Sequence, residues 1–158
     1  MGYRCWAERF VTADFSGSPV HYQKAVFSET MALIAVRSRF VVYNNPTMTT
    51  LSMRIYSSVS NAPSALLHTF DTTWTKAQMT TYDHGAREVY FEFTKPRHLV
   101  AGDTYFFVPW ISGYTGNDTS HIAWVKSYPD PFYTTGVTNE AVKAATMPYS
   151  IGFIGGAL

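Results

Sequence analysis

The chain has little charge, one cysteine and no long apolar run. Only 15% of its 158 residues are charged, against about 25% in an average soluble domain. The net charge of +1 gives no general attraction to nucleic acid or acidic lipid. Cys5 cannot form an intrachain disulfide, and no stretch approaches the roughly 20 apolar residues of a membrane helix. We expect a single domain without a nucleic-acid or membrane partner.

Motifs for catalysis and for metal binding are also missing. There is no GxSxG elbow, Walker loop or HExxH sequence. The five histidines are not spaced as metal ligands. The oxygen-rich stretch 113–120 has Asp118 as its only carboxylate, too few for a calcium loop. The sequence therefore predicts a protein that is not an enzyme, with no catalytic residue, no metal and no cofactor.

What the chain does have is aromatic residues, at 16%, and alternation of apolar and polar side chains. In 49–57, for example, Leu51, Met53 and Ile55 alternate with more polar residues, which is typical of a half-buried strand. Strands are expected at 31–43, 49–57, 87–94, 104–111, 120–127 and 148–155, and more weakly near 3–12, 22–28 and 65–70. Helical turns are expected at 73–79 and 139–147. The prediction is an all-β, jelly-roll-like antiparallel β-sandwich of about 8–9 strands.

The first 30 residues have the weakest pattern. We expect residues 1–30 to form an N-terminal arm or edge strands, and residues 31–158 to form the β-sandwich domain. The N-terminus lacks a secretory signal, which favours a protein made and kept in the cytosol. In the turn before 104–111, Gly102 is expected to need a positive φ angle.

The strand at 104–111 is apolar on both faces, which is unusual for a strand at a wet surface. One face belongs to the core, and Phe106, Val108 and Trp110 lie on the other. An N-terminal arm, the segment 139–147 or a neighbouring subunit could cover this second face, and we favour the neighbour. The predicted oligomer or capsid interface comprises Phe106, Val108 and Trp110 together with the arm residues Tyr3, Trp6 and Phe10.

A second hypothesis concerns the aromatic residues of 110–133. Exposed aromatic rings on a β-sandwich can stack against sugars, and the candidate platform comprises Trp110, Tyr114, Tyr128 and Tyr133. The competing interpretation is that these rings belong to the core or to a subunit contact, as expected for Trp124, which shares a face with Ile122.

Several short motifs carry a resemblance to a known module. They are "KPRHLVAGDTY" (95–105), "YTTG" (133–136) and "FIG" (153–155). The chain resembles, over about residues 31–156, a jelly-roll β-sandwich module of bacteriophage virion proteins and of bacterial surface proteins. The matching positions are Leu99, Ala101, Gly102, Tyr105, Tyr133, Gly136, Phe153 and Gly155.

The resemblance implies a non-enzymatic structural protein. The expected function is a capsid decoration or cement protein that binds and stabilises the assembled shell. Its expected partners are copies of itself, as a trimer, and the major capsid protein or other virion proteins. Its expected location is the virion, assembled in the host cytoplasm. The alternative is a tail-associated adhesion or carbohydrate-binding module with a host glycan as partner.

Overall fold

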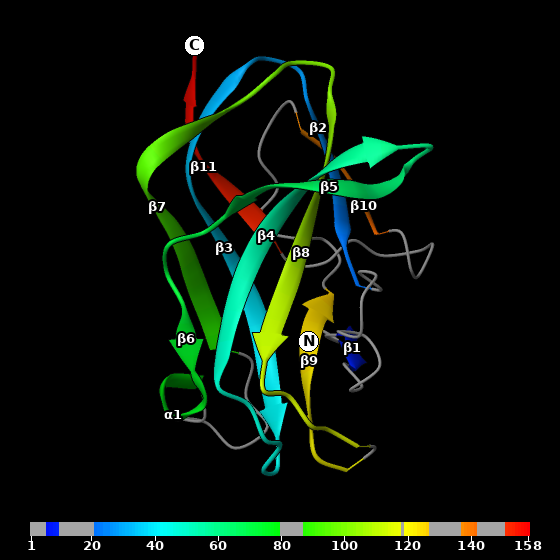
Figure 1. Ribbon diagram of the computed structural model, residues 1–158, viewed down its shortest axis with the longest axis vertical. Helices are drawn as coiled ribbons and strands as arrows, with labels where there is room; N and C mark the ends of the chain where they lie inside the picture. Colours follow the sequence, from blue (N-terminus) through cyan, green and yellow to red (C-terminus); the bar gives the residue numbers. More distant parts are fainter. Residues whose placement is uncertain (1–5, 10–20, 80–86, 118, 127–136, 142–150) are drawn as a thin grey trace, which may run out of the picture.

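Two antiparallel β-sheets face each other across one apolar core in the computed structural model (Figure 1). The structure describes residues 6–9, 21–79, 87–117, 119–126, 137–141 and 151–158. Only the backbone is described at 6–9, 126, 137–141 and 157. None of the helices in these ranges is long and apolar enough to cross a membrane.

The first sheet is organised around the long strand β3 (Met31–Tyr43). Strand β7 (Arg87–Leu99) pairs along one edge of β3. The other edge is shared, because β11 (Ile151–Ala157) pairs with the first part of β3 and β9 (His121–Lys126) with its last four residues. Strand β1 (Trp6–Arg9) pairs with the outer edge of β9.

The second sheet places β8 (Thr104–Ser112) between β2 (Gln23–Phe27) and β4 (Thr50–Val59). Strand β10 (Val137–Ala141) pairs with β2. The far edge of β4 pairs first with β6 (Trp74–Thr75) and then with β5 (Ala62–Thr69). Helix α1 (Lys76–Met79) follows β6.

Aromatic side chains join the two sheets. Phe153 of the first sheet makes edge-to-face contacts with Phe27 and Phe107 of the second, with ring centroids 5.2 and 4.9 Å apart. Trp124 is fully buried and stacks on Phe40. Aromatic pairs in these geometries add about 0.5–1.5 kcal/mol each to the stabilisation from area burial, so this cluster fixes how the sheets sit on one another.

The turn from β7 to β8 explains one of the motifs in the sequence. Leu99 is fully buried, Gly102 has a φ of 80°, and the Tyr105 hydroxyl accepts a hydrogen bond from the Val100 N–H at 2.8 Å. The Gly102 N–H donates to the Phe27 carbonyl of β2. The positive φ expected at Gly102 is confirmed, and these residues have structural roles in the turn.

The structure confirms the predicted all-β sandwich. Strand β3 has the predicted bounds, 31–43, and α1 lies within the helical turn expected at 73–79. The helical turn expected at 139–147 is wrong over its first residues, because 137–141 form a strand paired with β2; residues 142–147 lie outside the described part.

Two boundaries also differ from expectation. Strand β7 does not end at Lys95–Pro96 but continues to Leu99, with a change of register against β3 between Leu33 and Ala35. Within residues 1–30, β2 is an interior strand between β10 and β8 and not part of an arm. Strand β1 lies on an edge.

A glycine pair at the β11–β3 contact makes a matched test of this packing. A Cβ at Gly155 would lie 2.2 Å from the Ala32 carbonyl oxygen, whereas one at Gly156 would meet nothing within 4 Å. Gly155→Ala should therefore destabilise the protein by about 1–3 kcal/mol through overpacking. Gly156→Ala should stay within about 0.5 kcal/mol of the parent. Urea unfolding of the three proteins measures both values, and equal midpoints for the two variants would contradict the close approach.

Candidate binding surfaces

The outer face of β8 is covered within one chain. Phe106 is fully buried and Val108 is 2% exposed, and the Tyr22 ring meets Phe106 edge-to-face at 5.1 Å. Trp110 is half-buried, with the Arg54 guanidinium 4.0 Å from its ring centroid. A neighbouring subunit is therefore not needed to cover Phe106 and Val108, and it cannot reach them in this conformation. Of the three predicted contact residues on β8, Trp110 alone presents surface.

The predicted arm residues are only partly described. Tyr3 and Phe10 lie outside the described residues. The backbone of Trp6 belongs to β1 and pairs with Lys126 of β9, and its side chain is not described. The interface assignment of these three residues stays a prediction.

The aromatic residues of the predicted sugar platform are not brought together on the described surface. Tyr114 is 7% exposed, belongs to the core and accepts a hydrogen bond from the Ile122 N–H at 3.1 Å. It cannot offer a ring face to a sugar, so its assignment to the platform is wrong. Tyr128 and Tyr133 lie outside the described residues. Trp124 is buried, as expected.

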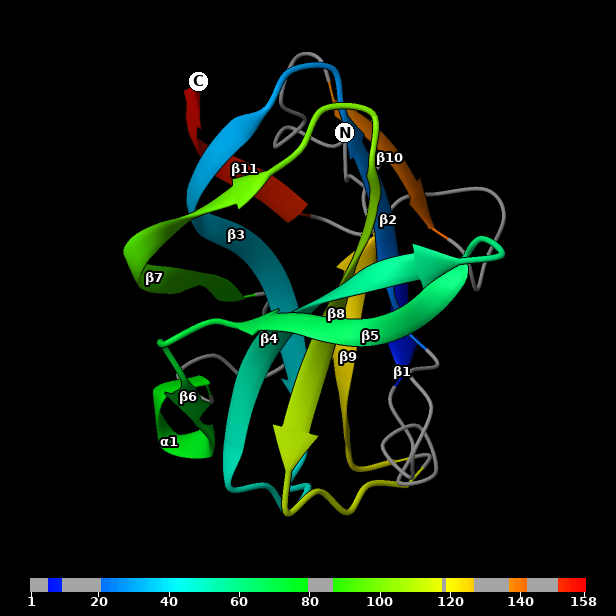
Figure 2. The ribbon, with the colours of Figure 1, turned by 45° about the horizontal axis from the view of Figure 1, so that its top comes forward.

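The hairpin of β4 and β5 presents apolar side chains that sequence reasoning did not single out. Figure 2 shows this hairpin reaching away from the body of the sandwich. Val59, Leu66 and Leu67 are 61%, 48% and 42% exposed. The turn at Ser60 and Asn61 has two positive φ angles, which suits a tight hairpin turn. The pattern of 65–70 indicated a strand, but nothing in it indicated that both leucines face outward.

The pairing of β5 with β4 is irregular. Opposite Ile55 and Tyr56 of β4 lie His68 and Leu66, so Leu67 is an extra residue in β5. A second shift follows between Tyr56 and Ser58. Bulges of this kind bend a strand, redirect side chains and discourage edge-to-edge pairing with another sheet. Pro63, which cannot donate a ladder hydrogen bond, adds to that protection.

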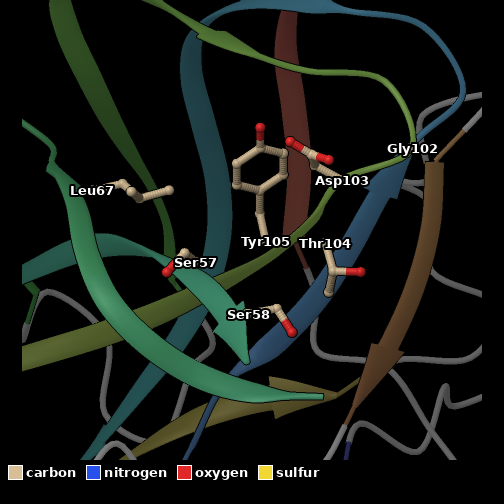
Figure 3. Close-up of a pocket in the computed structure, with 7 residues that line it drawn as sticks. All are labelled: Ser57, Ser58, Leu67, Gly102, Asp103, Thr104 and Tyr105. Carbon is tan, nitrogen blue, oxygen red and sulfur yellow. The ribbon is translucent and has the colours of Figure 1, made fainter. Parts of the chain in front are cut away.

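A groove of about 590 Å³ lies between this hairpin and the turn that enters β8 (Figure 3). Its lining comes from the end of β4, the middle of β5 and the first residues of β8 with the turn before them. The lining residues are Ser57, Ser58, Leu67, Gly102, Asp103, Thr104 and Tyr105. The groove thus offers hydroxyl groups and one carboxylate beside one leucine.

The other end of β5 packs against the first sheet through an aromatic cluster. Phe70 and Phe93 stack with their centroids 4.0 Å apart, and His68 meets Phe93 edge-to-face at 6.1 Å. The Arg97 guanidinium carbon lies 5.4 Å from the Phe93 centroid. Burial, and then the positive charge of Arg97, lower the pKa of His68 from its ordinary value of 6.5. The neutral imidazole is therefore the form that the folded protein favours.

The connection after β5 also contacts β7. The Asp71 N–H donates to the Glu92 carbonyl, and the Asp71 carboxylate accepts hydrogen bonds from the N–H and the hydroxyl of Thr94 at 2.7 and 2.9 Å. These two hydrogen bonds lower the pKa of Asp71. The base of the hairpin is thereby held to the first sheet while its tip projects.

Known proteins offer no guide to these surfaces. No protein-family model, no curated protein and no solved structure matches the chain. Within the described residues, no group of three or more histidine, cysteine, aspartate or glutamate side chains is placed to hold a metal ion.

The burial of Phe106 can be tested by charge insertion. Phe106→Asp should unfold the protein or destabilise it by at least about 4 kcal/mol, because the carboxylate would be buried without a partner. Val59→Asp places the same charge at an exposed position and should change stability by less than about 0.5 kcal/mol. Circular dichroism with urea unfolding measures both variants. A folded Phe106→Asp protein that has merely lost self-association would restore the interface assignment.

The environment of His68 predicts a pH dependence of stability. The unfolded chain binds a proton at His68 near pH 6.5, while the folded chain binds it only at lower pH. Stability is therefore fully present above pH 6.5 and is lost as the pH falls from there through the folded pKa. His68→Gln should remove this part of the pH dependence. Urea midpoints measured across this range test it, and parallel curves for the two proteins would refute it.

Proposed function

We propose that this chain is a non-enzymatic structural protein of a bacteriophage virion, a capsid decoration or cement protein that binds the assembled shell. In this proposal the protein associates with copies of itself, as a trimer, and with the major capsid protein or another virion protein. It acts by binding and needs no chemical step.

The support for a virion protein comes from the resemblance over residues 31–156. The matching residues within the described ranges have structural roles. Leu99 and Phe153 belong to the core, Gly102 permits the turn, and Gly155 permits the close approach to Ala32. Such residues specify a β-sandwich and its turns and not a site of chemistry, so the assignment to a virion rests on the sequence resemblance alone.

The observation that carries a docking role is the projecting hairpin of β4 and β5. It exposes Val59, Leu66 and Leu67 at one end of the sandwich, and its base is held by Asp71 and Phe70. Exposed large apolar side chains are a common feature of protein contact surfaces. The bulged edge favours contact through side chains over the addition of a strand to the sheet.

The physical effect of such a protein follows from mass action. A protein that binds the assembled shell and not the free capsid subunits shifts the equilibrium toward the intact shell. Each bound copy adds its own binding free energy, so many weak contacts on a lattice can together stabilise the shell.

The alternative of a tail adhesion module with a sugar platform at 110–133 has less support. Of the four candidate aromatic residues, Tyr114 is in the core, and Trp110 is half-buried beside Arg54. On the described surface, Trp110 is therefore the one aromatic residue of the predicted platform that is available. A platform that stacks on several units of a sugar chain would need more than one ring.

Cosedimentation with empty capsids tests the proposal. The capsids are those of the phage whose genome encodes the chain. The protein should bind them saturably, and Leu66→Asp should weaken binding by about tenfold or more, because a hot-spot contact contributes about 1–4 kcal/mol. Ser64→Asp introduces the same charge two residues away on the hairpin and serves as the matched control.

Two results would overturn the proposal. One is a wild-type protein that stays in the supernatant with intact capsids at every concentration. The other is equal binding by the Leu66→Asp protein, provided that both variants unfold at the same urea concentration as the parent. Light scattering on the free protein tests the trimer separately.

A further inference from the structure

We infer that the groove between the β4–β5 hairpin and the turn into β8 is a binding site for a neutral polyhydroxylated ligand, a short glycan or its terminal sugar. The inference does not depend on the virion proposal, because it rests on the lining of the groove alone. It also differs from the aromatic platform at 110–133 in both place and chemistry.

The size of the groove fits a small ligand. Its volume of about 590 Å³ lies within the roughly 300–1,000 Å³ of typical small-molecule sites. Gly102 lines the groove and is exposed, and a Cβ at this position would meet no atom within 4 Å. Its φ of 80° discourages any larger residue there. The backbone of the turn is therefore accessible beside the acidic side chain of Asp103.

The hydroxyl groups of the lining retain hydrogen-bonding capacity. Within the described residues, no hydrogen bond engages the hydroxyls of Ser58 and Thr104. The Ser57 hydroxyl accepts from the Ala65 N–H, and the Tyr105 hydroxyl accepts from the Val100 N–H. Both can still donate their own proton. The groove is thus lined by four residues whose hydroxyl groups can donate, and each can accept as well where a lone pair remains.

The single carboxylate of the lining favours a ligand that carries hydrogen-bond donors and no negative charge. Asp103 is exposed, and its oxygens can accept both protons of a vicinal diol. No lysine, arginine or histidine lines the groove, which disfavours an anionic ligand. Glycoside hydrolysis uses a pair of carboxyl groups, whereas this lining has one. The site is suited to binding a sugar and not to cleaving it.

The bulge in β5 supplies the apolar part of the site. Because Leu67 is the extra residue of the bulge, its side chain is directed to the groove and not into regular pairing with β4. A sugar ring has an apolar face of C–H groups that a leucine can cover. Tyr105 is 6% exposed and offers its hydroxyl but not its ring face. Without an aromatic stack the affinity should be weak, in the millimolar range.

A titration followed by backbone amide NMR tests the inference on the full chain without capsids. The probes are glucose, galactose and N-acetylglucosamine, with methylammonium chloride and sodium phosphate as charged comparisons. At least one sugar should shift the amides of 57–58, 67 and 102–105, and the two salts should not. Asp103→Asn should weaken sugar binding about tenfold, since hydrogen bonds to a charged group are the strong ones.

A matched variant controls for charge. Glu92→Gln removes an exposed carboxylate on β7, away from the groove, and should leave sugar binding unchanged. Three outcomes would overturn the inference: no shift with any sugar, shifts centred on Trp110 and not on the groove, or a response to methylammonium in place of sugars. Capsid binding is measured separately, so a failed sugar site and a failed docking role are distinguishable.

Discussion

The packing of Phe153 between Phe27 and Phe107 is the contact on which the two-sheet arrangement depends. Phe153 is on the last strand, yet it touches the second strand and the eighth. These edge-to-face contacts hold the sheets in register across the core. The close approach of Gly155 to Ala32 keeps β11 in place for that contact. The described parts of residues 1–30 and of the C-terminus are therefore integral to the sandwich.

That arrangement determines which surfaces are free. The core-facing side of β8 is filled by Tyr105, Phe107 and Ile111, and its outer side is buried at Phe106 and Val108. Among the described strands of the second sheet, the exposed large apolar side chains Val59, Leu66 and Leu67 lie at its edge, on the hairpin of β4 and β5. The stacked rings of Phe70 and Phe93 hold the base of this hairpin, so its tip can project without the strand separating from the sandwich.

The sequence predicted the fold well because the relevant signals are local. Alternation in 49–57 and the apolar run in 31–43 each reflect a single strand, and Gly102 reflects a single turn. The exposure of individual side chains is harder to predict, because it depends on contacts distant in sequence. Tyr114 looked like a surface aromatic, and its burial follows from packing with the strand that contains Ile122.

The exposure of Leu66 and Leu67 could likewise not be predicted from the alternation of apolar and polar residues in the sequence. Residues 64–67 are all exposed because the hairpin projects from the sandwich, and that projection is not encoded in the pattern of a single strand. The groove needs three segments, the end of β4, the bulge of β5 and the turn before β8. No spacing in the sequence connects Ser58, Leu67 and Asp103.

We propose that this protein acts by docking through the β4–β5 hairpin. Hydrogen–deuterium exchange of the protein, free and bound to capsids, tests it most directly. The backbone amides of 64–67, on the outer edge of the sheet, should become protected on binding, and those on the opposite side of the sandwich, in β11, should not change. Protection confined to β3, β7 and β11, with unchanged exchange in the hairpin, would contradict the claim.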